Sequence, residues 1–251
     1  MSIAAAISAM GIHSKNKEPH ATDFFESLTV PAAAGGTSDD KGQEYNSDFL
    51  APKFIIPHEK GPERWSCQYN KNEITSTKHG TIISIGKRST TKPFSCGELI
   101  SRQPNIGYGT YSVDMISTNI PGHVTALFVI ANDISELDIE LTGRDPTVVW
   151  INIWEGSKQH PIKVPLGFDA SKDWHNYAIE WRKDFVAWYV DGKLIHKRSD
   201  VSTADPATTQ YKLALNSWTH DNDDQWAGKF RYPSDGHVPK SYFRNLSYKS
   251  G

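Results

Sequence analysis

One short stretch of the chain alternates strictly between acidic and apolar residues. Its central positions are, in order, Glu136, Leu137, Asp138, Ile139, Glu140 and Leu141. A period of two is typical of a β-strand with one buried face and one open face, so the pattern predicts a strand over residues 135–143. The three carboxyl groups then share one face. Their mutual repulsion is expected to raise the pKa of some of them, or to be relieved by a substrate.

Strand-length apolar segments separated by turn residues continue along the chain from Phe49 onward. Residues 124–130 form a near-continuous apolar run, which indicates a strand buried on both faces. Asp191 and Gly192 stand between two such segments and predict a tight hairpin turn. Further strands are expected around residues 80–86, 97–101, 107–115, 148–154, 174–181, 185–190, 212–218 and 241–248. Many short strands with no convincing long helix predict an all-β sandwich.

The first 46 residues lack a sustained period of either kind. They mix Ala, Gly, Ser, Asp and Lys, so residues 1–46 are expected to be a mostly disordered tail and residues 47–251 the folded domain. Residues 1–10 are apolar but short, with no basic residue ahead of them, and are a poor signal peptide. The sequence contains no run of 18 apolar residues, so no membrane span is predicted.

Composition narrows the classes of partner. The formal net charge is only −2, so it indicates neither nucleic acid nor an anionic membrane as a partner. We also expect the protein to be a monomer. The eight Trp residues suit stacking on sugar faces, although core packing is the better explanation for any single Trp. The two cysteines, Cys67 and Cys96, predict one disulfide and an oxidising compartment. Two buried free thiols are the alternative.

The acidic trio suits cleavage of a glycosidic bond. A retaining glycosidase needs a carboxylate nucleophile and a carboxylic acid about 5–5.5 Å apart. We expect Glu136 to be the nucleophile and Glu140 the general acid/base, with Asp138 between them to tune the nucleophile. The alternative is a strand whose acidic face is merely solvated.

The sequence Glu136-Leu-Asp138-Ile-Glu140 resembles the E-[IL]-D-x-E signature of glycoside hydrolase family 16. The resemblance extends over roughly residues 64–248. It implies a β-jelly-roll sandwich of the concanavalin A type, with the motif strand in a concave cleft, and a double-displacement mechanism. It also implies a Cys67–Cys96 disulfide, as in bacterial lichenases, and places residues 173–192, including His175, in the convex sheet as packing residues.

The same resemblance implies a set of sugar-binding residues. Asn152 and Trp154 correspond to an amide and an aromatic on the strand after the motif, and Asn216 and Trp218 to an Asn-x-Trp pair beside the nucleophile. The remaining implied positions are Trp65, Glu98, Arg102 and Trp226. Three of these, Trp65, Glu98 and Arg102, correspond to residues on the non-reducing side, and the match for Arg102 needs one inserted residue. Packing is the alternative role for each.

Several positions depart from the family pattern. Ser135 replaces the usual Asp before the motif, and the short segment ahead of it places Ile134 near where lichenases carry a Trp. The short segment resembles that of the fungal transglycosylases in length and leaves transfer to a sugar acceptor open. Arg244 stands where many members use an Asp to hold Ca²⁺. Since a hard cation needs oxygen ligands, no calcium is expected there, and no catalytic metal or cofactor is expected elsewhere.

Three functions follow from these observations. The leading one is a secreted or cell-wall retaining endo-β-glucanase acting on β-1,3-1,4-glucan or β-1,3-glucan. A cell-wall glucan or chitin transglycosylase using the same intermediate is the second. A lectin-like glycan-binding module is the third, and it would not need the acidic trio.

Overall fold

The computed structural model describes residues 45–46, 53–58, 65–77, 80–102, 106–131 and 135–251. The predicted tail of residues 1–46 lies almost wholly outside the described residues, so that boundary stays a prediction. Short strands begin the described chain and longer ones follow. Their bounds are β1 Tyr45–Asn46, β2 Phe54–Ile55, β3 Cys67–Tyr69, β4 Ile74–Thr77, β5 Gly80–Ser84, β6 Gly86–Lys87, β7 Phe94–Ser101, β8 Gly109–Ile116 and β9 His123–Ala131. The others are β10 Ser135–Thr142, β11 Val148–Glu155, β12 Lys158–Gln159, β13 Ile162–Pro165, β14 His175–Trp181, β15 Val186–Val190, β16 Lys193–Arg198, β17 Lys212–Thr219 and β18 Lys240–Ser250.

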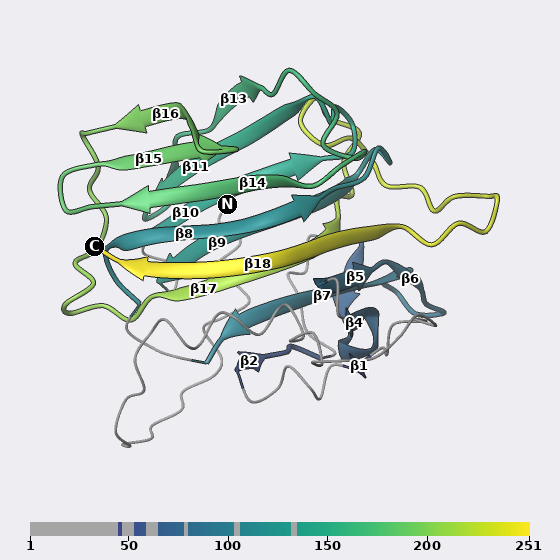
Figure 1. Cartoon of the computed structure of the whole chain (residues 1–251). Helices are drawn as coiled ribbons and strands as arrows, with labels where there is room; N and C mark the ends of the chain where they lie inside the picture. The colour runs from purple at the N-terminus through teal and green to yellow at the C-terminus, as the bar shows by residue number, and fades with distance from the viewer. Residues whose placement is uncertain (1–44, 47–52, 59–64, 78–79, 103–105, 132–134) are drawn as a thin grey trace, which may run out of the picture.

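Two antiparallel sheets pack face to face, with β14, β8 and β18 in front of β10, β9 and β17 in Figure 1. The front sheet has the order β1-β4-β5-β18-β8-β14-β15-β16 among the described residues. The rear sheet has the order β12-β11-β10-β9-β17-β7-β2, with β13 also pairing with β11, and β3 and β6 pairing with β7. The described helical structure is a single 3-10 turn at Lys71–Glu73. The all-β sandwich prediction is confirmed.

The main core fills the space between the sheets. Strand β10 contributes Leu137, Ile139 and Leu141, which are completely buried in this layer. The indole Nε1 of Trp188 on β15 donates a hydrogen bond to the carbonyl oxygen of Asp138, at 3.1 Å, across the two sheets. Because the apolar half of the alternating pattern anchors β10 to this core, the acidic half must face outward from the sandwich.

A second, smaller apolar cluster covers part of the outward face of the rear sheet. It includes Cys67, Cys96, Trp65 and Phe128. Cys67 and Cys96 form a disulfide that ties β3 to β7, so the predicted pairing is confirmed. The predicted turn at Asp191–Gly192 is also confirmed, since both residues have the positive φ values, 50° and 74°, that this hairpin requires.

Candidate active site

The registers of the rear sheet bring the candidate residues into lateral rows. Glu140 on β10 pairs with Trp150 on β11 and with Ala126 on β9. Ala126 pairs with Asn216 on β17, and Asn216 pairs with Glu98 on β7. Directly paired residues share a face, so this row crosses five strands and is roughly 14 Å long from β10 to β7. Segments more than a hundred residues apart thus form one polar surface.

The neighbouring rows carry the other two acids. Asp138 pairs with Asn152 on one side and Phe128 on the other, while Glu136 pairs with Trp154. The predicted amide and aromatic of β11 therefore lie directly beside the two acids. The alternation of β10 and β11 alone produces this arrangement once the register between them is set.

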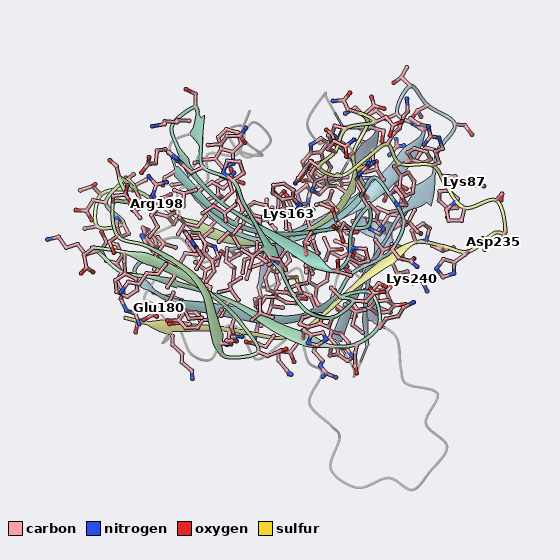
Figure 2. The ribbon with its side chains drawn as sticks, turned by 90° about the horizontal axis from the view of Figure 1, so that it is seen from above. Lys87, Lys163, Glu180, Arg198, Asp235 and Lys240 are labelled. Carbon is pink, nitrogen blue, oxygen red and sulfur yellow. A yellow bond between two sulfur atoms is a disulfide. The ribbon has the colours of Figure 1, made fainter. Side chains whose placement is uncertain are left out.

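A cavity of about 390 Å³ lies over these rows. Seen from above in Figure 2, this face opens between two raised walls, one bearing Arg198 and the other Lys87. The cavity is lined by Trp65, Asp138, Glu140, Trp150, Ile151, Asn152, Trp154, Gln159, Pro161, Trp218, His220, Asn222 and Trp226. Seven of the predicted site residues are among them. Glu136, Glu98 and Asn216 share the same face by register but do not line the cavity.

The acidic trio is more enclosed than the sequence pattern indicates. Glu136 and Asp138 are each 1% exposed and Glu140 is 8% exposed, so the face predicted to be open is covered. Side chains from β11, β17 and the walls surround it. Burial, followed by the charges of Glu136 and Glu140, raises the pKa of Asp138 well above its usual value. A solvated acidic face is therefore excluded.

Glu98 is a second buried carboxyl group on this surface. Its Oε2 accepts hydrogen bonds from Tyr69 Oη at 2.6 Å and Asn216 Nδ2 at 3.1 Å. Burial raises the pKa of Glu98 to about 7, although both hydrogen bonds oppose that rise. The sequence analysis did not find Tyr69. Tyr69 lies two residues after Cys67 and so on the same face of β3 as Cys67. Only the pairing of β3 with β7 reveals that Tyr69 contacts Glu98.

The aromatic side chains of the site pack on each other. The rings of Trp65 and Trp218 stack with centroids 4.2 Å apart, and each residue is 3% exposed. Trp226 lies against Trp218 at 5.8 Å and is half-buried. Trp65 and Trp218 thus pack against each other, and their stacking on a sugar stays a prediction.

The loop that carries Trp226 is held by Asp224, a residue that was not predicted from the sequence. One carboxylate oxygen accepts hydrogen bonds from the backbone N–H groups of Trp226, Ala227 and Gly228 at 3.0–3.3 Å. The other oxygen lies 2.7 Å from His220 Nε2. One side chain thus fixes both cavity-lining rings of this loop.

Polar atoms without a partner gather on this surface. Among the described residues, no hydrogen bond satisfies Trp65 Nε1, Trp218 Nε1, Glu98 Oε1 or Asn216 Oδ1. Buried polar atoms are normally paired, so these donors and acceptors suit a ligand rich in hydroxyl groups.

Residues 61–234 match the family model described as glycosyl hydrolases family 16. The chain belongs to this family. A β-glucanase of Bacillus subtilis (strain 168) is 32% identical to it over 213 residues, covering 82% of this chain and 85% of the relative. A solved β-1,3-1,4-glucanase (lichenase) derived from a mouse hindgut metagenome matches with a TM-score of 0.71 and 26% identity, covering 84% and 99% of the two chains. The Crh5 transglycosylase in complex with NAG matches in fold, with a TM-score of 0.64 and 19% identity over 84% of each chain.

As a family 16 member, the protein is a glycoside hydrolase with a β-jelly roll of the concanavalin A type. Three remaining positions can now be placed. Arg102 is exposed just beyond β7, outside the cavity lining, so its sugar-binding role stays a prediction. Arg244 lies 3.3 Å from Asp114 and over the ring of Trp174. His175 is in the front sheet, 2.7 Å from Asp191, as predicted for a packing residue.

The position of Ile134 has no structural test. Ile134 lies outside the described residues. Among the residues that are described, no helix has the length and apolar character needed to cross a membrane.

Proposed function

We propose that the protein is a retaining endo-β-glucanase acting on β-1,3-1,4-glucan or β-1,3-glucan. The observation that carries the proposal is the set of three buried carboxyl groups on β10, those of Glu136, Asp138 and Glu140, beneath a cavity lined by tryptophans and amides. The similarity to the β-glucanase of B. subtilis and to the lichenase supports the choice of substrate.

In the first step, Glu136 attacks the anomeric carbon while Glu140 gives its proton to the departing glycosidic oxygen. The bond between carbon and leaving oxygen breaks, and a glycosyl ester on Glu136 forms. In the second step, Glu140 takes a proton from water, whose oxygen attacks the anomeric carbon and releases Glu136. The carbon is inverted twice, so its configuration is retained.

Asp138 serves as the positioning residue between the two catalytic carboxyl groups. Its raised pKa favours the protonated acid, which can donate a hydrogen bond to a neighbouring carboxylate. A neutral Asp138 also relieves the repulsion that three adjacent negative charges would create.

Sugar binding is assigned to both sides of the trio. Glu98 and Asn216, with their unpartnered oxygens, hold hydroxyl groups on the β17 and β7 side, where Trp65, Trp218 and Trp226 provide apolar surface. Asn152 and Trp154 act on the β11 side. The backbone N–H of His160 donates to Asn152 Oδ1 at 2.8 Å, which leaves the amide Nδ2 directed to other partners.

A transglycosylase is the second candidate, since the same intermediate can pass to a carbohydrate hydroxyl instead of water. The half-buried Trp150 ring beside Glu140 favours it, because a sugar acceptor needs an apolar face to stack on. The disulfide supports secretion into an oxidising compartment.

The test is digestion of barley β-glucan and laminarin with product analysis, together with proton NMR of the first anomer released. We expect short oligosaccharides that appear first as the β-anomer. Glu136→Gln should abolish release, whereas the matched control Glu180→Gln, on the opposite side of the molecule in Figure 2, should not. An unchanged Glu136→Gln variant, or no release from any β-glucan, would exclude the proposal and revive the glycan-binding module.

A further inference from the structure

Trp150 differs from the other tryptophans of the cavity. It lines the cavity on β11 but is half-buried, whereas Trp65, Trp218 and Trp154 are only 3–6% exposed. Trp226 is also half-buried, yet its ring contacts Trp218 and His220. Among the described residues, no aromatic ring packs against Trp150. The Nζ of Lys163 lies over the ring, 5.9 Å from its centroid. Because Trp150 is half-buried and lines the cavity, the part of the ring that faces the cavity can contact a ligand.

The position of Trp150 ties it to one catalytic group. It pairs directly with Glu140 across β10 and β11, which places their side chains on the same face about 5 Å apart at Cβ. Glu140, as proposed above, protonates the departing oxygen and later deprotonates the incoming hydroxyl. A sugar that carries this oxygen must therefore lie against Glu140, within reach of the Trp150 ring.

The two sides of the trio differ in openness. On the β17 and β7 side, Glu98 and Asn216 are fully buried and carry unpartnered oxygens, which suits a sugar held throughout the covalent intermediate. On the β11 side, the part of the chain that the structure describes adds only the short strands β12 and β13, at the edge of the sheet. A leaving group must depart and an acceptor must enter while the donor sugar stays bound, so the β11 side is the suitable one for exchange.

Lys163 extends the same row outward. It pairs with Trp150 across β11 and β13, and its Nζ lies 5.9 Å from the Trp150 ring centroid. The same Nζ is 3.2 Å from Asp145 Oδ2, which holds the amine beside the ring. Figure 2 shows Lys163 between the two raised walls, where a sugar approaching Trp150 from the sheet edge would pass.

We infer that Trp150 is the stacking platform for the sugar on the leaving-group and acceptor side, and that it sets the ratio of transfer to hydrolysis. This inference rests on the proposed function. When an acceptor stacks on Trp150, its hydroxyl loses a proton to Glu140, its oxygen bonds to the anomeric carbon, and the ester bond to Glu136 breaks. Water completes the same step without using the ring.

The experiment uses an aryl β-glycoside of a β-glucan oligosaccharide as donor and a fluorescently labelled β-glucan oligosaccharide as acceptor. The ratio of labelled transfer product to hydrolysis product is measured at several acceptor concentrations. Both products come from one glycosyl-enzyme, so the ratio does not depend on how fast that intermediate forms. Trp150→Ala is expected to lower the ratio about tenfold at subsaturating acceptor.

Two further variants control the result. Trp150→Phe retains an aromatic face and should recover most of the ratio. Trp174→Ala removes an equally half-buried tryptophan that stacks on Arg244, away from the cavity, and should match the wild type. Circular dichroism and thermal unfolding confirm that each variant is folded.

An unchanged ratio in folded Trp150→Ala, whatever its total rate, would overturn the inference and leave the proposed function intact. A ratio lowered equally by Trp150→Phe would also overturn it, because stacking would then not be the cause. A wild-type protein that consumes neither the aryl donor nor any β-glucan would overturn both proposals at once.

Discussion

The phenol of Tyr69 donates a 2.6 Å hydrogen bond to the carboxylate of Glu98, and both side chains are buried. Tyr69 belongs to β3, which the Cys67–Cys96 disulfide holds against the strand that carries Glu98. The disulfide, the tyrosine and the carboxyl group thus form one unit that fixes Glu98 Oε2, while Oε1 has no hydrogen-bond partner among the described residues. Three of the predictions below concern this unit.

Tyr69→Phe should raise the pKa of Glu98 above its wild-type value of about 7, because the lost hydrogen bond lowers that pKa. A hydrogen bond to a charged group contributes roughly 1.5–3 kcal/mol, which corresponds to a rise of about 1–2 pH units. Carbon-13 NMR titration of labelled Glu side chains would measure it. An unchanged or lower pKa would show that Tyr69 does not stabilise the charged form.

Glu98→Gln should make stability less dependent on pH between about 4.5 and 7. In the wild type, the folded-state pKa of Glu98 lies above its ordinary value, so the folded protein binds the extra proton and loses stability as pH rises through this range. The loss is roughly 3 kcal/mol at most. Urea unfolding should show that the stability of the variant, relative to that of the wild type, is greater at pH 8 than at pH 4.5. Equal gains at both values would contradict the prediction.

Reduction of the disulfide should weaken both stability and binding. The two cysteines are 29 residues apart, and loop closure of that length corresponds to about 3–4 kcal/mol. Cys67→Ala/Cys96→Ala should unfold at correspondingly lower urea and show a raised KM, since Tyr69 and Glu98 lose their fixed spacing. Thermal unfolding of wild type with and without dithiothreitol provides the comparison. A variant with wild-type KM would show that the disulfide does not contribute to substrate binding.

Asp138→Asn should raise the stability of the folded protein and lower its catalytic rate. Burial and two neighbouring carboxyl groups raise the pKa of Asp138, so folding at neutral pH requires this carboxyl group to take up a proton, at a free-energy cost that a neutral amide does not have. We expect about 1–2 kcal/mol greater stability at pH 7 and a lower kcat, because the amide cannot tune Glu136 as a carboxyl group does. Urea unfolding and initial rates would be measured together. A destabilised variant would contradict the electrostatic argument.

His123 should contribute to unfolding in acid. It lies between the sheets, 2.6 Å from Ser217 Oγ, and burial lowers its pKa to about 3. The unfolded chain therefore binds a proton that the folded one excludes, and stability falls as pH decreases from about 6.5 towards 3. His123→Gln should flatten that part of the stability curve, measured by urea unfolding at pH 4 and pH 6.5. If the stability of the variant fell as much between pH 6.5 and pH 4 as that of the wild type, acid unfolding would be due to other groups.

The local patterns were enough to predict most long strands and the catalytic candidates. The alternation around Asp138 predicted β10, and the apolar run ahead of it predicted β9, which is buried at all nine positions. The short strands β1, β2, β3, β4, β6, β12 and β13 were not predicted, because two to four residues carry too little periodicity to distinguish a strand from a turn.

The site itself was predicted unevenly, for a physical reason. Glu136 could be proposed from the alternation on its own strand, and Asn152 from the resemblance to the family. Tyr69, Asp224 and Trp150 could not, because their roles depend on partners on other strands or on backbone N–H groups. The exposure of the acidic face was also predicted wrongly, since alternation says which side chains share a face but not what covers that face.

The sequence by itself determined that the chain is all-β, that three carboxyl groups share one face of one strand, and that Cys67 and Cys96 are the available pair for a disulfide. These properties depend on local periodicity and residue type. Only the tertiary structure decided that Glu140 lies beside Trp150, that Tyr69 holds Glu98, and that burial shifts the pKa of Asp138 and Glu98. Such properties depend on strand register and on the exclusion of water, which arise from contacts between segments far apart in the chain.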